Sequence, residues 1–184
     1  MGGLASKDQL RMSFLRWALV AVPAIVLLGF LSGTSVANGA DSAWYRALQK
    51  PALTPPGWLF PVAWTILYIL MGLALAVILH ARGARGRGGA LALFVVQFVL
   101  NLIWTPVFFG QHKVSLALWI IVAMLVAATA TTIAFGRIRR VAAWLMVPYL
   151  VWISFAGVLN WRIDQFNPDA QHLVPGAAKL QISL

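Results

Sequence analysis

The 184-residue sequence contains no cysteine and no glutamate, and its only acidic residues are four aspartates. Without cysteine, disulfide bonds, thiolate metal sites and cysteine nucleophiles are excluded. Charged residues make up 10% of the chain, whereas they make up roughly 25% of average soluble domains. Hydrophobic residues reach 61%, more apolar surface than a soluble domain of this length can bury. The composition therefore predicts an integral membrane protein.

Charge is also missing from five long apolar segments, residues 17–40, 51–79, 88–111, 114–136 and 141–161. Each reaches the roughly 20 residues that a helix needs to cross a bilayer, and helices satisfy their own backbone in lipid. We therefore predict an all-α membrane protein, a five-transmembrane-helix bundle with a long loop between helices 1 and 2. The single domain covers residues 1–165, with helices at about 14–36, 57–80, 89–110, 114–136 and 140–162. Residues 166–184 form a C-terminal tail.

The basic residues are distributed unevenly over the predicted loops. On the N-terminal side lie Lys7, Arg11, Arg16, Arg82, Arg85, Arg87, Arg137, Arg139 and Arg140. On the other side lie Arg46, Lys50, Lys113, Arg162 and Lys179. Because cytoplasmic loops carry an excess of lysine and arginine, we predict a cytoplasmic N-terminus in a bacterial inner membrane. The net charge of +10 then reflects topology, and we expect the lipid bilayer and no nucleic acid as a partner.

The apolar segments lack every ionisable residue that proton pathways use. No Asp, Glu, Lys, Arg or His falls within them, which argues against a proton-coupled pump. His80, His112 and His172 are scattered over the predicted loops and tail. We therefore predict no metal site, no required cofactor and no catalytic residue, and the sequence leaves open whether the protein is an enzyme.

A proline-rich loop leads into the second predicted helix. The residue before a proline is pushed out of the α region, so the loop is stiff and extended up to Pro56. Beyond it, Trp64 and Tyr68 fall on one helix face because they are four residues apart. We predict that the loop forms a lid over a ligand pocket and that this face forms its wall. The lid residues are Trp44, Pro51, Pro55, Pro56 and Trp58.

Two further helices carry polar and aromatic stripes. One stripe contains Gln97, Asn101, Trp104 and Phe108, and the other contains Tyr149, Trp152 and Ala156. The two amides either form interhelical hydrogen bonds or line a cavity and bind a ligand. The deep tryptophans and tyrosines suit a large planar apolar ligand, with plain core packing as the alternative. The Gly29–Gly33 spacing fits either dimerisation or packing inside the bundle.

Three segments together resemble the tryptophan-rich sensory protein (TspO) family, the bacterial relatives of the mitochondrial translocator protein or peripheral-type benzodiazepine receptor. The first runs from Trp44-Tyr45 through Lys50-Pro51 and Pro55-Pro56-Gly57-Trp58 to Trp64, Tyr68 and Met71-Gly72. The second runs from Gln97 through Asn101 and Trp104 to Phe108-Phe109-Gly110. The third runs from Pro148-Tyr149 through Trp152 and Ala156 to Leu159-Asn160. The order of the segments is that of the family.

The resemblance implies a homodimeric five-helix protein that binds porphyrins and drugs of the benzodiazepine and isoquinoline type. Trp64 and Trp152 match tryptophans tied to tetrapyrrole binding and its photochemical breakdown. Asn101 matches a polar pocket residue, and Ala156 matches a small position whose enlargement perturbs ligand binding. Leu53 replaces the tryptophan that the family places in the lid loop.

The sequence thus predicts an integral membrane protein with a sensory or regulatory role and a porphyrin, such as protoporphyrin IX, as its ligand. Two alternatives stay open. One is a photo-oxidative enzyme that degrades porphyrins, in which the tryptophans take part in redox chemistry. The other is a transporter of porphyrins or other lipophilic molecules. The predicted ligand-binding residues are Trp64, Tyr68, Gln97, Asn101, Trp104, Tyr149, Trp152 and Ala156.

Overall fold

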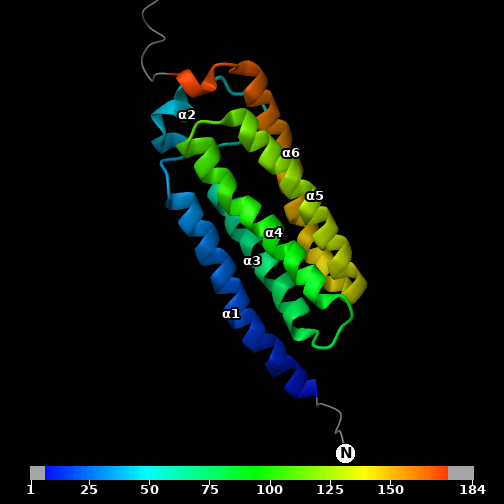
Figure 1. Cartoon of the computed structure of the whole chain (residues 1–184). Helices are drawn as coiled ribbons and strands as arrows, with labels where there is room; N and C mark the ends of the chain where they lie inside the picture. Colours follow the sequence, from blue (N-terminus) through cyan, green and yellow to red (C-terminus); the bar gives the residue numbers. More distant parts are fainter. Residues whose placement is uncertain (1–6, 174–184) are drawn as a thin grey trace, which may run out of the picture.

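The computed structural model describes residues 7–173, which form five long helices lying side by side (Figure 1). The long helices are α1 (Lys7–Thr34), α3 (Leu59–His80), α4 (Arg87–Thr105), α5 (Val114–Ile138) and α6 (Arg140–Phe166). All five are long and apolar enough to cross a membrane. The prediction of an all-α protein with five membrane-spanning helices is confirmed.

Several short elements join these helices. The loop between α1 and α3 contains a 3-10 helix (Gly39–Asp41) and the one-turn helix α2 (Ala43–Ala47). A π-helical turn (Pro106–Gly110) extends α4, and a 3-10 helix (Ala170–His172) follows α6. None of these was predicted, because each is shorter than the window over which hydrophobic periodicity can be read. Of the predicted tail, residues 174–184 lie outside the described part of the chain.

The helix ends depart from the predicted bounds at both ends of the chain. The first helix begins at Lys7 instead of about residue 14, and the last ends at Phe166 instead of 162. The predictions stopped where charge began, but backbone hydrogen bonding continues past the apolar segment. The added turn of α6 is held in place, since Ile163 is buried and Ser115 Oγ donates to Asp164 Oδ1 over 2.6 Å.

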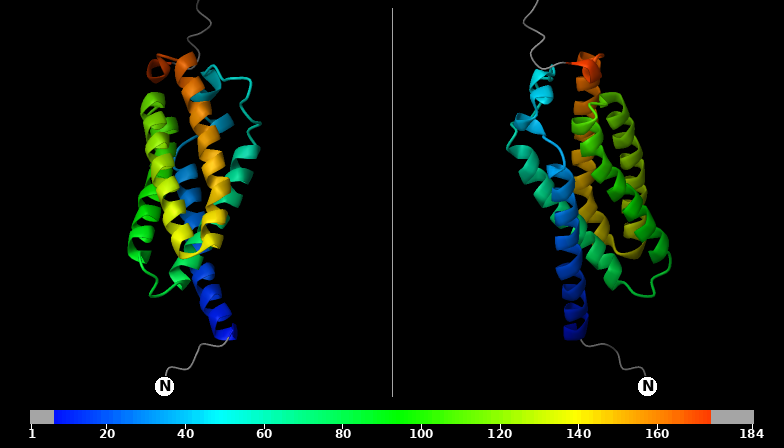
Figure 2. Two further views of the ribbon diagram at one scale, coloured as in Figure 1. Left: turned by 90° about the vertical axis from the view of Figure 1, so that its right-hand side faces the viewer. Right: turned by 60° about the vertical axis from the view of Figure 1, so that its left-hand side comes forward.

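The helices are arranged so that neighbours in space are not always neighbours in sequence. α3 packs against α1 and α6, and α5 packs against α4 and α6. A smaller contact between α1 and α4 closes the ring of helices. Figure 2 shows that α2 and the segment after α6 lie at one end of the bundle, here called the α2 end, while the N-terminus lies at the other. Segments about 120 residues apart in sequence therefore meet at the α2 end.

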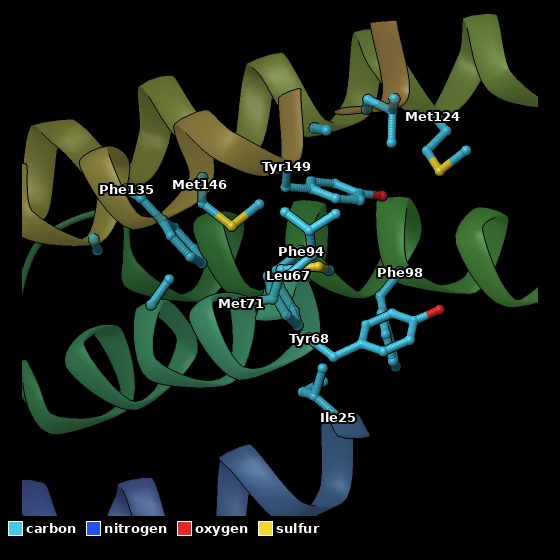
Figure 3. Close-up of a cluster of buried hydrophobic side chains, with 14 of the residues drawn as sticks. Ile25, Leu67, Tyr68, Met71, Phe94, Phe98, Met124, Phe135, Met146 and Tyr149 are labelled. Atoms are coloured by element: carbon cyan, nitrogen blue, oxygen red, sulfur yellow. The ribbon is translucent and has the colours of Figure 1, made fainter. Parts of the chain in front are cut away.

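The bundle is densely packed in the half that lies toward the N-terminal end. Met71 and Ile78 of α3 are fully buried, and the Phe94 and Phe135 rings stack with centroids 5.8 Å apart. A methyl group on Gly72 would lie 2.6 Å from Val22 Cα of α1, so only glycine allows this approach. Figure 3 shows these side chains within a larger cluster that continues to Tyr68 and Met124. This half leaves little room for a ligand.

Candidate functional site

A cavity of about 990 Å³ occupies the half of the bundle that lies toward the α2 end. All five long helices and the segment between α1 and α3 contribute to its walls. Its volume is at the upper end of the roughly 300–1,000 Å³ typical of small-molecule sites. Six of the eight predicted ligand-binding residues line it, namely Trp64, Tyr68, Asn101, Trp104, Trp152 and Ala156.

The wall formed by α3 and α6 is a connected group of aromatic rings. Trp64 stacks on Tyr68 with ring centroids 5.3 Å apart and meets Trp152 edge-on at 6.4 Å. Phe60 continues the wall, with its ring 6.0 Å from that of Trp152. Such offset and edge-on pairs are favoured by the ring quadrupoles. The sequence thus places Trp64 and Trp152 on different helices, and the fold brings them into contact.

The opposite wall is built on α4 and the π-helical turn. Trp104 stacks on Phe108 with ring centroids 5.0 Å apart, and both line the cavity together with Phe109. Pro106 begins the turn, and the Gln111 N–H donates to the Pro106 carbonyl over 2.9 Å, a π-type bond. Single π-helical turns of this kind are frequently found at functional sites. Both phenylalanines of this turn, Phe108 and Phe109, line the cavity.

Asn101 is the polar centre of the site. Its Oδ1 accepts a hydrogen bond of 3.0 Å from the Tyr68 hydroxyl, and its Nδ2 donates to the Tyr149 hydroxyl over 3.4 Å. The Met124 sulfur lies 3.7 Å from the same nitrogen. Two readings were open for Asn101, an interhelical hydrogen bond or a cavity residue. The structure shows the interhelical hydrogen bonds and also places Asn101 in the cavity lining, and binding of a ligand by this amide stays a prediction.

Gln97 and Tyr149, the other two predicted ligand-binding residues, lie outside the cavity lining. Tyr149 is fully buried behind Trp64, with ring centroids 6.5 Å apart. Gln97 is also fully buried, and within residues 7–173 neither its amide nitrogen nor its oxygen has a hydrogen-bond partner. Among the described residues, Gln97 therefore neither forms an interhelical hydrogen bond nor lines the cavity.

The predicted lid divides into two parts. Pro55 and Trp58 line the cavity, whereas Trp44, Pro51 and Pro56 do not. Trp58 is 66% exposed, as expected for a residue at a cavity rim. Trp44 is 3% exposed, and its indole N–H donates to the Ala170 carbonyl over 2.7 Å. Trp44 thus anchors the loop to the segment after α6.

Two further contacts fix the first half of this loop. Asn167 binds the backbone of Gln49 twice, accepting from its N–H and donating to its carbonyl, each over 2.9 Å. The His112 ring stacks on Trp44 with centroids 4.3 Å apart. His112 has a φ of 58°, the left-handed region, which brings its ring back over the loop. The loop is thus held by the α4–α5 turn and the C-terminal end of α6.

Lys50 ends the anchored part of the loop, next to Tyr45. Its ammonium donates to the carbonyls of Tyr45 over 2.7 Å and Leu48 over 3.0 Å, and it lies 4.7 Å from the Tyr45 ring centroid. Partial burial lowers the pKa of Lys50 below its ordinary value, and burial raises the pKa of Tyr45. Both side chains line the cavity.

Glycines of α1 complete the site. Gly29 and Gly33 both line the cavity. A methyl group on Gly29 would lie 2.2 Å from the Tyr68 ring, whereas one on Gly33 would have no neighbour within 4 Å. Gly29 therefore packs inside the bundle. This was one of the two interpretations of the Gly29–Gly33 spacing, the other being dimerisation. The predicted site omitted these glycines and Phe60, although the glycine spacing was a usable signal.

A smaller cavity of about 250 Å³ lies at the surface of the α2 end, between the α4–α5 turn and the segment after α6. None of the predicted site residues lines it. In the described part of the chain, no three His, Asp or Glu side chains come together to hold a metal ion. The large aromatic cavity is therefore the candidate site.

Comparisons with known proteins agree with this architecture. Residues 20–166 match the TspO/MBR family. The chain is 42% identical over 142 residues to the tryptophan-rich protein TspO of Chlorobaculum tepidum, covering 77% of this chain and 89% of the relative. It is 41% identical over 163 residues to the tryptophan-rich sensory protein of Cereibacter sphaeroides (84% and 97%). It is 35% identical over 142 residues to the human translocator protein (76% and 84%). The chain therefore belongs to the TspO/MBR family of multi-pass membrane proteins.

Proposed function

We propose that the protein is a membrane sensor that binds a porphyrin in the cavity at the α2 end. The observation that carries this proposal is the paired indole wall, in which Trp64 and Trp152 meet edge-on beside Tyr68. A wall of this kind offers stacking and edge contacts to a flat conjugated ring. The cavity volume of about 990 Å³ leaves room for a ligand of tetrapyrrole size.

The polar groups of the cavity support the same ligand. Asn101 and the Tyr68 hydroxyl are hydrogen-bonded polar groups in a lining that is mostly aromatic and aliphatic. A few polar groups in an apolar pocket orient a ligand and set its specificity. Drugs of the benzodiazepine and isoquinoline type are planar and apolar as well, and we expect them to compete with the porphyrin for this cavity.

The sensory role is supported by the name of one relative and by the absence of charged residues from the apolar segments. One similar protein is named tryptophan-rich sensory protein, and no charged residue lies within the apolar segments predicted from the sequence. Such residues mark the proton and ion pathways of many transporters, so their absence from these segments counts against a proton-coupled pump. In such a sensor, the change between the ligand-free and the ligand-bound state reports the presence of the porphyrin.

We also propose that the protein lies in a bacterial inner membrane with its N-terminus in the cytoplasm. The turn between α3 and α4 and the α5–α6 junction lie at the N-terminal end and carry Arg82, Arg85, Arg87, Arg137 and Arg139. The excess of arginine at this end favours the cytoplasmic side. The α2 end and the cavity beneath it then face the outside. Labelling of single cysteines introduced at Ala84 and Ala52 tests this orientation.

The binding proposal is tested by titrating the full-length protein in lipid nanodiscs with protoporphyrin IX. We expect saturable quenching of tryptophan fluorescence, and weaker binding in Trp64→Phe combined with Trp152→Phe, because the smaller phenyl rings give up part of the contact area of the two indoles. The matched control is Trp119→Phe combined with Trp144→Phe, since these indoles are 69% and 73% exposed on the outer faces of α5 and α6. Unchanged affinity in the first pair would overturn the site assignment.

A second candidate activity is favoured by the same indole pair. Trp64 and Trp152 lie in ring contact, close enough to share an oxidised state next to a bound porphyrin. In this reading light excites the porphyrin, dioxygen takes up the electrons, and the porphyrin ring is oxidised and opened. Illumination with oxygen should then yield a defined product, and loss of Trp64 should slow it. Equal destruction of porphyrin by denatured protein would overturn the activity.

A further inference from the structure

The arginines at the N-terminal end of the bundle have no acidic counterpart among the described side chains. The aspartates whose side chains the structure describes, Asp41, Asp164 and Asp169, all lie at the α2 end. The segment that joins α5 to α6, residues 137–140, is here called the α5–α6 corner. It carries three arginines in four positions and no acidic residue. The positive charge of this corner is therefore not balanced within the described part of the chain.

The backbone of the α5–α6 corner is fixed by hydrogen bonds. α5 ends at Ile138 and α6 begins at Arg140, so Arg139 alone joins the two helices. The Arg139 N–H donates to the Phe135 carbonyl over 2.7 Å, and the Arg139 carbonyl accepts from the Ala142 N–H over 3.0 Å. The three arginine side chains of the corner therefore start from a backbone that both helices hold in place.

The guanidinium groups of the corner are available to a ligand. Arg137, Arg139 and Arg140 are all exposed. Arg139 donates one N–H to the Ile138 carbonyl over 3.1 Å and keeps its other donors. Among the side chains of residues 11–173, neither Arg137 nor Arg140 has a hydrogen-bond or ion-pair partner. The corner therefore offers several unused N–H donors and three positive charges to an anion from outside the chain.

The residues next to the corner place it at the level of a lipid headgroup. Ile133 of α5 comes one turn before Arg137 and is 53% exposed, and Trp144 of α6 comes one turn after Arg140 and is 73% exposed. Residues four apart share a helix face, and each helix has a further exposed valine seven residues deeper in the span. Exposed tryptophans mark the headgroup level of a membrane. The arginines therefore lie beside the lipid phosphates, and the apolar residues lie beside the acyl chains.

We propose that the α5–α6 corner binds the phosphate headgroup of an anionic phospholipid, whose acyl chains lie along the outer faces of α5 and α6. The planar fork of a guanidinium matches two oxygens of a phosphate. A zwitterionic headgroup fits less well, because its ammonium group would lie beside three arginines with no carboxylate to receive it. A soluble phosphate lacks the chains that the exposed apolar faces contact. The site lies at the other end of the bundle from the aromatic cavity and goes beyond the proposed function.

The test is native mass spectrometry of the full-length protein in a neutral detergent, mixed with equal amounts of phosphatidylglycerol and phosphatidylcholine. The two lipids have the same acyl chains and one phosphate each, and only phosphatidylglycerol carries a net charge. We expect the protein to retain phosphatidylglycerol roughly tenfold over phosphatidylcholine, because neighbouring arginines each add to the attraction for an anionic lipid. Glycerophosphoglycerol, the same headgroup without acyl chains, should not displace the lipid. Its displacement of the lipid would show that a soluble phosphate is the ligand and would refute the lipid site.

Variants of the corner separate its charge from its structure. Arg137→Gln combined with Arg139→Gln and Arg140→Gln should lower the ratio of the two retained lipids about fivefold. Lysine at the same three positions keeps the charge and should keep most of the preference for phosphatidylglycerol. Circular dichroism checks that each variant keeps its helices. If the triple glutamine variant does not fold, Arg140→Gln alone should lower the ratio by a smaller factor, and an unchanged ratio in that variant would count against the site.

The matched control removes the same charge from the same end of the bundle. Arg11→Gln combined with Arg16→Gln and Arg85→Gln changes three exposed arginines of α1 and of the α3–α4 turn. This variant should keep the ratio within about twofold of the unmodified protein, because general attraction to a basic surface is weaker than binding at one site.

Two results would overturn the inference. One is an equal loss of preference in the two triple variants, which would show that anionic lipid collects around any basic residue at this end. The other is equal retention of the two lipids by the unmodified protein. Either result leaves the proposed porphyrin binding untouched, since the α5–α6 corner does not line the aromatic cavity.

Discussion

Glycines and aromatic residues occur in both halves of the bundle, but they pack closely in one half and border a cavity in the other. Toward the N-terminal end, Gly72 lets α1 approach α3 so closely that a methyl group would meet the Val22 backbone. Toward the α2 end, Gly33 faces open space and lines the cavity. The Phe94–Phe135 stack fills one half, whereas the Trp64 and Trp152 rings border a void in the other. A glycine therefore allows close helix packing in one half and leaves space for the cavity in the other.

The contrast indicates that the packed half provides most of the stability, whereas the half with the cavity is available for ligand binding. The packed half holds the helices together, so the other half can keep a large cavity that a well-packed interior would not tolerate. The loop above the cavity is anchored by the hydrogen bonds of Trp44 and Asn167 to distant parts of the chain. Substitutions in the two halves should accordingly affect different measurements, and the following predictions test that separation.

The largest loss of stability is expected from Gly72→Ala. The added methyl group would lie 2.6 Å from Val22 Cα, so α1 must move away from α3, at a cost of about 3 kcal/mol. The matched control is Gly33→Ala, where nothing lies within 4 Å and the change should stay below about 0.5 kcal/mol. Unfolding followed by circular dichroism in detergent measures both. Equal losses at the two glycines would refute the contrast between the halves.

Asn101→Leu should cost about 2 kcal/mol, because it leaves two buried hydroxyls without their partner. Asn101 joins α4 to Tyr68 on α3 and Tyr149 on α6. The loss should be smaller in a Tyr68→Phe background, since one of those hydroxyls is already absent. A double-mutant cycle on unfolding free energies measures this coupling. Simple additivity of the two substitutions would contradict the network.

Gly33→Phe should reduce porphyrin affinity about tenfold, equal to about 1.4 kcal/mol, with little change in stability. The phenyl ring has space to enter the cavity that Gly33 lines. Leu31→Phe is the control on the same helix, because Leu31 is 65% exposed. Fluorescence titration and thermal unfolding are needed together. If Gly33→Phe lowered the stability and left the porphyrin affinity unchanged, Gly33 would serve helix packing and would not be part of the binding site.

The smallest effect, and one of opposite sign, is expected from Gln97→Leu. The buried amide has no hydrogen-bond partner among the described residues, so its removal should raise the free energy of unfolding by about 1 kcal/mol. Thr131→Val is a matched control, because the equally buried Thr131 hydroxyl donates to the Ala127 carbonyl over 2.7 Å and its loss should destabilise. A loss of stability in Gln97→Leu would show that the amide is solvated inside the bundle.

The sequence predicted the wall of the site better than its lid. Trp64, Tyr68 and Asn101, which were predicted from helical spacing that puts residues three or four apart on one face, do line the cavity. That spacing does not say which part of a face meets a cavity, so Gln97, one turn from Asn101, was assigned to the ligand although it is buried away from it. Trp44 was assigned to the lid because no local pattern shows its bond to Ala170, 126 residues away.

Composition and hydrophobic length by themselves determined the class of the protein and the number of membrane-spanning helices. These follow from the cost of exposing backbone and charge in lipid, which acts on each segment separately. Only the tertiary structure decided where the helices close and where they leave a cavity. That outcome depends on contacts between distant residues, such as Gly29 with Tyr68 and Gly72 with Val22, and no single segment contains that information.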